Sequence, residues 1–528
     1  PADDNGNDAN IPLELITIDG LRSHVEWLAD DVREGRLAGS PGHEASAEYV
    51  VNFFAELGLE PAGEEGWLQQ VPLITYQIDT ENNAVNIHRD GVDRALNYRD
   101  DYAMGGDTVR AEDTVRGEVV YVGFGVHAPD LGYSDYDGID VDDRIVAMFG
   151  GAPSTFEHDQ RAYYASGRTK RQEAVARGAI GTIFLFSRHD ERRIPWERVK
   201  RTTGKQPAMA WVNLSGEAAD YFPQLRGSIS LSADAATGIM AASPITFEAA
   251  RDAIESDTVA SVPLGFEASL SRRTIHDRIQ SPNVIGMVRG TDPELSKEFV
   301  VYSAHLDGVG IEHAPDGDDT IRNGAYDNAM GISIMLETAR VMAADPPKRS
   351  VLFVAVTAEE RGLLGSDYFA HYPTVPADSI VANVNVDMPL FLYPVADLVA
   401  FGAEHSSLDA VAEAAARAEG FALTPNPLPE ENLFVRSDQY SFVRQGIPAI
   451  YFEPGFTSAD PAIDGEELVR DHMLNHYHKV SDDLSRPVDW DSVERFTRAH
   501  VRIGYDVADN PNRPEWNEGD FFAERFVK

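Results

Sequence analysis

Three apolar segments in the second half of the chain each end just before ionisable residues. EFVVYSA precedes His305, VLFVAVTA precedes Glu359 and Glu360, and VANVNV precedes Asp387. Amphipathic helical patterns such as NAMGISIMLETARVMAA separate these segments. Apolar strands that alternate with helices predict an α/β fold, with a mostly parallel mixed sheet sandwiched by helices. Ligands bind beyond the carboxyl ends of strands in such sheets, so we expect these side chains to meet at one edge.

The rest of the chain predicts a divided catalytic domain. A chain of 528 residues is too long for one ordinary compact core. Residues 21–59 show helical spacing and 68–100 show short strands, whereas a β, β, α, β order runs from about 113 to 275. We therefore predict that 1–112 and 276–528 form the catalytic domain and that 113–275 is a smaller, β-rich inserted domain.

Charge and composition exclude several classes of partner. The formal net charge of −42 repels nucleic acid and anionic membranes, and salt adaptation or simple solubility explains it better than an acidic partner-binding face. No apolar run reaches the roughly 18 residues of a membrane span. Zero cysteines leave histidine and carboxylates as strong metal ligands. The polar start at proline suggests a mature chain whose signal peptide was removed, so we expect a secreted or periplasmic protein.

Two of the candidate site residues have common structural alternatives. In His305-Leu306-Asp307, the carboxylate of Asp307 could accept the second ring N–H of a metal-binding His305, although this spacing is frequent in proteins. Asp327, in NGAYDNAMG, precedes a predicted helix, where an aspartate often serves only as a cap.

The remaining candidate residues also have both a functional and a structural interpretation. Glu359 and Glu360 could divide the roles of general base and metal ligand, or form a solvated charge pair like other Glu pairs of this acidic chain. Asp387 follows a strand so apolar that it is either a ligand or a costly burial. The segment HMLNHYHKVSDDL offers histidines at 472, 476 and 478, and their spacing does not choose among them.

Several dispersed motifs together resemble one enzyme family. They are HLDG at 305–308, NGAYDNAMG at 323–331, AEERGLLGS at 358–366, NVD at 385–387, RSDQYSF at 436–442 and YHKVSDD at 477–483. In this order they resemble the M28 family of zinc aminopeptidases and carboxypeptidases, in the subgroup with a protease-associated insert. The resemblance is strong over about 280–485 and weaker over EGRLAGSPGHEAS near the N-terminus. By placement and strand order, 113–275 resembles the protease-associated domain.

The resemblance implies a site that holds two zinc ions. His305 and Asp387 would hold one zinc, Glu360 and His478 the other, and Asp327 would bridge the two. His478 is preferred over His476 because it matches the Tyr-His step of the family.

The same resemblance assigns the catalytic roles. Glu359 would be the general base, Asp307 the partner of His305, Tyr477 a donor to the oxyanion, and Arg436 a contact to substrate. Each role is carried over from the family motif and not from spacing.

The expected function is hydrolysis of a terminal peptide bond in peptide substrates. Aminopeptidase is the commonest activity of the family, and carboxypeptidase and dipeptidase remain open. A glutaminyl-cyclase-like enzyme fits the chain length and insert poorly. A non-catalytic, receptor-like scaffold would not need the complete ligand set. The insert would restrict substrate length, and the sequence does not predict an oligomeric state.

Overall fold

The computed structural model describes residues 11–312 and 317–527. The chain forms two compact units, one from Pro1–Val71 with Gln280–Lys528 and the other from Pro72–Ile279. The chain passes from one unit to the other within two long strands, β2 (Leu68–Arg89) and β12 (Val262–Val288). The second unit is therefore an insertion between two parts of the first.

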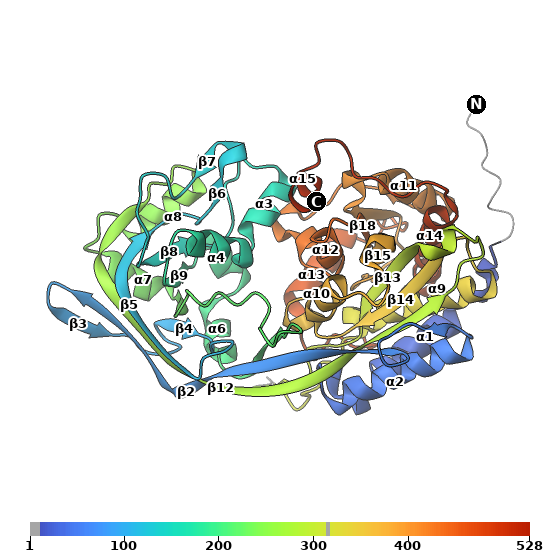
Figure 1. The fold of residues 1–528 in the computed structure, drawn as a ribbon, viewed down its shortest axis with the longest axis horizontal. Coiled ribbons are helices and arrows are strands. Elements are labelled where there is room, and N and C mark those ends of the chain that lie inside the picture. Colours follow the sequence, from blue (N-terminus) through green and yellow to red (C-terminus); the bar gives the residue numbers. More distant parts are fainter. Residues whose placement is uncertain (1–10, 313–316, 528) are drawn as a thin grey trace. The chain divides into compact units, whose positions relative to one another are not determined.

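The first unit is built on a mixed sheet that is mostly parallel (Figure 1). Its strand order is β17-β16-β18-β15-β13-β14-β12. Strand β13 pairs in parallel with both β14 and β15, and β15 pairs in parallel with β18, whereas β16 and β12 run antiparallel to their neighbours β18 and β14. The strands of this unit are β1 (Glu60–Pro61), β13 (Phe299–His305), β14 (Ser350–Val356), β15 (Ile380–Asn385), β16 (Asp397–Phe401), β17 (Ala422–Leu423) and β18 (Ala449–Pro454).

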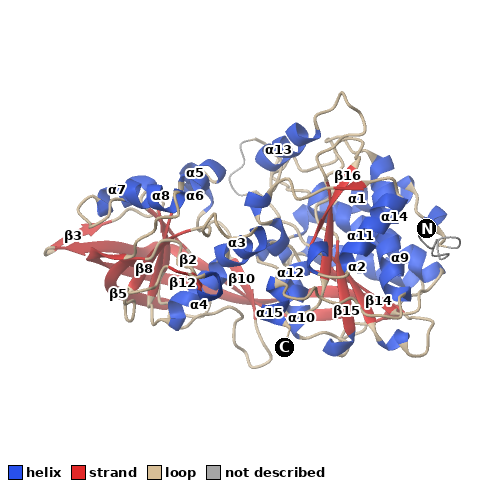
Figure 2. Cartoon of the chain, turned by 90° about the horizontal axis from the view of Figure 1, so that it is seen from above, coloured by secondary structure: helices blue, strands red, loops and turns tan. Residues whose placement is uncertain are grey.

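Helices cover both faces of this sheet, as Figure 2 shows. Helices α9 and α14 pack on one face of β13 and β15, with α1 and α11 against them, and α10 and α12 lie on the other face. The helices are α1 (Ile18–Leu28), α2 (Pro41–Glu56), α9 (Gly331–Ala344), α10 (Leu364–His371), α11 (Leu408–Ala418), α12 (Gln439–Val443), α13 (Gly465–Asn475), α14 (Trp490–Asp509) and α15 (Phe521–Phe526).

The side chains of β13 explain why this strand is apolar throughout. Val300 and Tyr302 join the core cluster that contains α9 and α14, whereas Val301 joins the cluster on the other face with Phe369 and Phe442. Successive side chains of a strand point to opposite faces, so a strand covered on both sides has no solvated position. The predicted fold class, a mostly parallel mixed sheet sandwiched by helices, is confirmed.

The strands of the inserted unit follow the order β12-β5-β8-β9-β11-β4, with β2 paired to β3 and β10. Its strands are β3 (Val92–Ala95), β4 (Tyr102–Met104), β5 (Glu112–Tyr121), β6 (His127–Ala128), β7 (Tyr133–Ser134), β8 (Ile145–Phe149), β9 (Gly181–Leu185), β10 (Ala208–Trp211) and β11 (Ser228–Leu231). Its helices are α3 (His158–Ala165), α4 (Gly167–Ala176), α5 (Arg188–Arg193), α6 (Trp196–Thr202), α7 (Ala233–Met240) and α8 (Phe247–Glu255).

The inserted unit begins earlier than the sequence pattern suggests. Residues 72–112, predicted to belong to the catalytic domain, pair with strands of the insert: Tyr76 lies opposite Ala208, and Met104 lies opposite Ile229. Alternating hydrophobicity reveals that 68–100 forms strands but not which distant strands they join. The compact unit consequently spans Pro72–Ile279 instead of 113–275.

Candidate metal centre

The carboxyl ends of three neighbouring strands carry the predicted ionisable residues. His305 is the last residue of β13, and Asp387 lies two residues beyond the end of β15. Glu359 and Glu360 lie in a 3-10 turn (Glu359–Arg361) just after β14. Because β13 runs parallel to both β14 and β15, these residues share one edge of the sheet, as the sequence predicts.

His305, Asp327 and Asp387 form a first group of possible metal ligands. The His305 Nε2 atom lies 2.9 Å from an oxygen of Asp387 and 3.1 Å from an oxygen of Asp327. One ligand atom from each residue lies within 4.8 Å of the others, and all three side chains are buried. The group combines one imidazole with two carboxylates.

Asp327, Glu360 and His478 form a second group of the same composition. The His478 Nε2 atom lies 3.0 Å from a Glu360 oxygen and 3.1 Å from an Asp327 oxygen. Oδ1 of Asp327 contacts His305 and Oδ2 contacts His478, so this carboxylate is shared by both groups. The geometry therefore brings all five predicted ligands together around Asp327.

The other two histidines of the C-terminal segment lie elsewhere. His476 contacts Ser481 through Nδ1 at 2.8 Å, and His472 packs its ring edge-to-face against Tyr326. Within the part of the chain that the structure describes, neither joins a group of three possible ligands. His478 is the histidine that lies beside Glu360 and Asp327.

Burial of so many carboxylates in one place fits a site for cations. The Oε1 atom of Glu360 is buried, and within 11–312 and 317–527 it has no hydrogen-bond partner. Buried carboxylates are costly unless a cation compensates them. Burial lowers the pKa of His478, but Glu360 and Asp327 raise it more, to about 10, so in the metal-free chain the imidazolium supplies positive charge. Two imidazoles with three carboxylates are donors that zinc accepts.

Glu359 lies beside these groups but belongs to neither. Its carboxylate is 3.9 Å from His305 Nε2, and its side chain retains 12% exposure. Burial raises the pKa of Glu359 well above its usual value, and Asp387 and Glu360 add to this rise, although His305 lowers it. A carboxylate with a raised pKa and access to a pocket is suited to accept and return a proton near neutral pH.

Asp307 lies next to His305, but its carboxylate contacts another loop. His305 Nδ1 lies 3.2 Å from the main-chain carbonyl oxygen of Asp307, whereas the carboxylate is 3.9 Å away. The carboxylate instead accepts hydrogen bonds from the backbone N–H groups of Glu359 at 3.0 Å and Glu360 at 3.4 Å. Asp307 therefore orients His305 through its carbonyl and holds the Glu359–Glu360 turn through its side chain.

Sequence reasoning missed two buried residues, one that holds the backbone of Asp327 and one that holds the residues on either side of Asp387. The carboxylate of Asp482 accepts hydrogen bonds from the backbone N–H groups of Tyr326 at 3.0 Å and Asp327 at 3.2 Å. The carboxamide of Asn328 donates to the Val386 carbonyl at 2.9 Å and accepts from the backbone N–H of Met388 at 3.1 Å. Both residues lie inside motifs that were recognised, NGAYDNAMG and YHKVSDD, which is the one signal that could have revealed them.

A pocket of about 50 Å³ opens beside these carboxylates. Tyr477 and Arg436 line it, together with Asp327, Glu359, Asp387, Met388, Leu433, Ser437, Tyr451 and Met473. The Tyr477 ring stacks on the ring of His478, with centroids 3.8 Å apart. Burial raises the pKa of Tyr477 well above its usual value, so its hydroxyl keeps its proton and can donate. Arg436 contacts the Glu431 carboxylate at 3.4 Å and its carbonyl at 3.2 Å.

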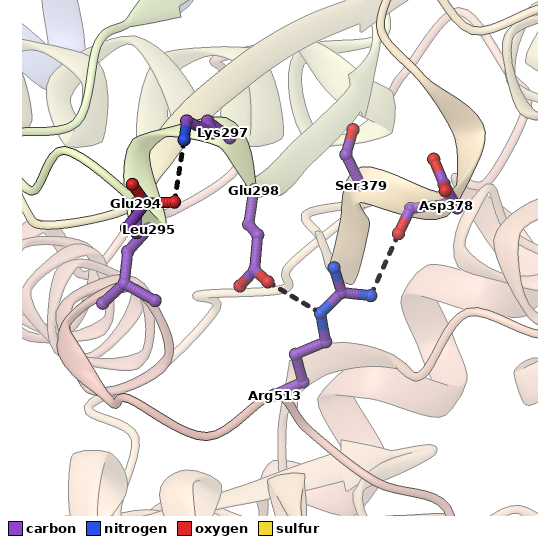
Figure 3. A pocket seen from close by; sticks show the side chains of 7 residues that line it. All are labelled: Glu294, Leu295, Lys297, Glu298, Asp378, Ser379 and Arg513. Atoms are coloured by element: carbon purple, nitrogen blue, oxygen red, sulfur yellow. Dashed lines mark hydrogen bonds and ion pairs between the residues drawn. The ribbon is translucent and has the colours of Figure 1, made fainter.

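A larger, open pocket of about 320 Å³ lies at the opposite edge of the sheet (Figure 3). Glu298 and Ser379 in its lining directly precede β13 and β15, so this pocket is at the amino ends of those strands. Its two cations are paired: Arg513 donates to Glu298 at 2.9 Å, and Lys297 donates to Glu294 at 2.7 Å. This pocket therefore does not compete with the carboxylate-rich one as a catalytic site.

Known proteins resemble the part of the chain that contains these groups. The sequence model of peptidase family M28 matches residues 283–503, a segment that contains both groups of possible ligands and Glu359. This segment belongs to peptidase family M28. The resemblance drawn from the motifs is thereby confirmed for the M28 segment.

Individual relatives match the chain over shorter stretches. Aminopeptidase NAALADL1 of Mus musculus is 30% identical over 142 residues, which is 25% of this chain and 17% of that protein. Aminopeptidase YwaD of Bacillus subtilis (strain 168) is 32% identical over 123 residues, 23% of this chain and 24% of that protein. The matched stretches thus span less than a quarter of either curated relative.

A solved structure shares the fold over nearly the whole length of the chain. An aminopeptidase from Aneurinibacillus sp. strain AM-1 aligns with a TM-score of 0.54 at 18% sequence identity, covering 96% of this chain and 98% of that chain.

Among the residues described for our chain, no helix is both long and apolar enough to cross a membrane.

Proposed function

We propose that the chain is a zinc aminopeptidase with two metal ions at the edge of its parallel sheet. The observation that carries the proposal is the shared carboxylate of Asp327, which contacts His305 with one oxygen and His478 with the other. A carboxylate with this arrangement suits a bridge between two cations. The M28 family match and the relatives named as aminopeptidases support a metallopeptidase of this class.

The proposed ligands divide into two sets. His305 and Asp387 would hold one zinc, Glu360 and His478 the other, and Asp327 both. When bound, the two ions would polarise the scissile carbonyl and lower the pKa of a water molecule toward neutrality.

The protein supplies the proton transfers and the orientation of the substrate. A carboxylate oxygen of Glu359 would take a proton from the attacking water and pass it to the leaving amine. The hydroxyl of Tyr477, which lines the same pocket, would donate a hydrogen bond to the developing oxyanion. Arg436, which lines this pocket, would contact the peptide.

The charge of the pocket favours an amino-terminal substrate. Three carboxylates line it, those of Asp327, Glu359 and Asp387, and its lining contains one guanidinium, that of Arg436. This guanidinium already contacts Glu431, whereas a carboxypeptidase needs a cation free to bind the terminal carboxylate of its substrate. The described lining therefore offers no free cation to a terminal carboxylate, and together with the relatives named as aminopeptidases this supports aminopeptidase over carboxypeptidase.

The identity of the inserted unit and the location of the protein are predictions. We predict that the unit Pro72–Ile279 is the protease-associated-like insert, with the boundaries of the compact unit in place of 113–275. A secreted or periplasmic location is a prediction of the same kind.

Peptides blocked at one end test the proposed function. We expect the purified, zinc-loaded chain to hydrolyse free tripeptides, to lose at least about 100-fold in rate when the amino end is acetylated, and to tolerate a carboxyl-terminal amide. Loss of activity on amidation alone would establish a carboxypeptidase. Conversion of an amino-terminal glutamine to pyroglutamate would establish a cyclase, and the absence of any reaction would leave the non-catalytic scaffold.

A further inference from the structure

The N-terminal segment EGRLAGSPG contains a buried arginine that the proposed chemistry does not use. Arg36 is only 1% exposed, although it ends the short 3-10 segment Asp31–Arg36 between α1 and α2. An arginine is almost never buried unless its charge and N–H groups have partners. The contacts of this guanidinium therefore indicate its role.

The Arg36 guanidinium donates to four main-chain carbonyls. Nη1 donates to Asn323 at 2.6 Å and to Leu28 at 2.7 Å. Nη2 donates to Gly324 at 2.9 Å, and Nε donates to Leu306 at 3.1 Å. The planar fork of the guanidinium can serve acceptors on different segments at once, which a lysine ammonium cannot do in the same fixed geometry.

Three of these four carbonyls lie at the two ends of the segment between His305 and Asp327, and we call these ends the His305 loop and the Asp327 loop. Leu306 directly follows His305, and Gly324 lies three residues before Asp327. The main chain reinforces the contact, because the N–H of Gly308 donates to the Arg36 carbonyl at 3.2 Å. One side chain from the N-terminal segment thus connects the His305 loop to the Asp327 loop.

Glycine at position 35 allows this close approach. Gly35 has a φ of +67°, in the left-handed region that favours glycine, and its carbonyl accepts from Gly310 N–H at 3.1 Å. A Cβ atom at this position would lie 2.5 Å from the carbonyl oxygen of Arg322. The Gly-Arg pair is therefore suited to lie against the ligand-bearing loops.

Arg36 also places a permanent positive charge near the acidic groups. The carboxylates that attract it most strongly are those of Asp482, Asp327, Asp307 and Glu360. Its hydrogen bonds go to carbonyls and not to these carboxylates, so the carboxylates stay available to other partners.

We infer that Arg36 is a positioning residue of the metal centre, holding the loops of His305 and Asp327 at the separation that two-zinc binding requires. The inference rests on the proposed function and deepens it. It assigns a role to the N-terminal motif, which lies outside the M28 segment 283–503.

Hydrogen exchange on the metal-free chain tests the positioning role without relying on zinc. In Arg36→Met we expect the amides of Gly308, Gly310 and Ala325 to exchange at least tenfold faster than in the unsubstituted chain, with unchanged rates in α9. Arg33→Met is the matched control, because the Arg33 guanidinium lies 3.6 Å over the Trp27 ring in the same segment. Unchanged exchange, or equal acceleration throughout the first unit, would overturn the inference.

Zinc affinity, measured by competition with a chromophoric chelator, links the loops to the metal. We expect the zinc dissociation constant to rise at least tenfold in Arg36→Met and at least threefold in Arg36→Lys, which keeps the charge but not the fork. If Arg36→Met does not fold, hydrogen exchange and zinc affinity are measured on Arg36→Lys instead, and these two results test the positioning role. An unsubstituted chain that binds no zinc contradicts the proposed function itself, whereas normal zinc binding with unaltered affinity in both Arg36 variants contradicts only the role of Arg36.

Discussion

Glu359 and Glu360 are adjacent in the 3-10 turn after β14, and changing each to glutamine should impair a different function. One change should remove proton transfer and the other should weaken zinc binding. Glu359 lines the pocket and lies outside both groups of possible ligands, whereas Glu360 lies 3.0 Å from His478 Nε2 within one of them. Glutamine preserves the size of the side chain and removes its charge and basicity. Glu359→Gln should therefore abolish proton transfer and keep the metals, and Glu360→Gln should lose a metal.

The magnitudes follow from these positions. Removing a general base lowers the rate by about 10² to 10⁴, which corresponds to about 3 to 5 kcal/mol in the activation barrier. We expect Glu359→Gln to lose this much in kcat with little change in KM. In Glu360→Gln, zinc affinity at one site should fall by more than the roughly 10- to 100-fold typical of residues that only orient ligands.

The assay measures zinc content and hydrolysis of one free tripeptide on the same samples. The unsubstituted chain and Glu359→Gln should hold equal amounts of zinc after identical dialysis, and Glu360→Gln should hold less. Full activity of Glu359→Gln would refute its role as the base. Equal zinc content in all three proteins would refute the division of roles between the two glutamates.

Three further changes test the surroundings of the site and the inserted unit. Asp482→Asn leaves one acceptor oxygen for the backbone N–H groups of Tyr326 and Asp327, so zinc affinity should fall about 10- to 100-fold. The neighbouring Asp483→Asn is the control and should change zinc affinity less than about twofold. Equal effects of the two substitutions would contradict the role of Asp482. Tyr477→Phe should lower kcat by about 10- to 1,000-fold at unchanged zinc content, and an unaltered kcat would exclude it as an oxyanion donor. In the inserted unit, burial lowers the pKa of Lys170 to about 7, so the folded chain releases a proton that the unfolded chain keeps. The free energy of unfolding, measured by urea denaturation, should therefore rise from about pH 7 to pH 10 relative to that of Lys170→Met, and parallel pH profiles would contradict this explanation.

The ends of the apolar strands predicted the edge of the sheet at which the site lies. The apolar segments before His305, Glu359 and Asp387 form most of the parallel strands β13, β14 and β15, and the topology brings these residues together. Asp327 and His478 lie outside these strands, and their assignment depended on the family motifs. Strand pattern thus predicted the edge of the sheet that these residues share, and the family motifs predicted that Asp327 and His478 lie beside them; the roles of all five residues stay predictions.

Residues that hold the ligands in place were not predictable in the same way. Asp482 and Asn328 act through backbone N–H and carbonyl groups of distant segments, and hydrophobic periodicity carries no information about such contacts. The boundary near Pro72 was missed for a related reason, because strand pairing between residues more than 100 positions apart has no local signature. Asp307 was recognised from the sequence as the partner of His305, but its carboxylate accepts hydrogen bonds from the Glu359–Glu360 turn.

The number of zinc ions per chain tests the central claim most directly. Elemental mass spectrometry of the zinc-saturated, dialysed chain should give about two zinc ions per chain, and His478→Ala should retain about one, because His305, Asp327 and Asp387 remain in place. One zinc in the unsubstituted chain, or two in His478→Ala, would contradict a dinuclear site bridged by Asp327.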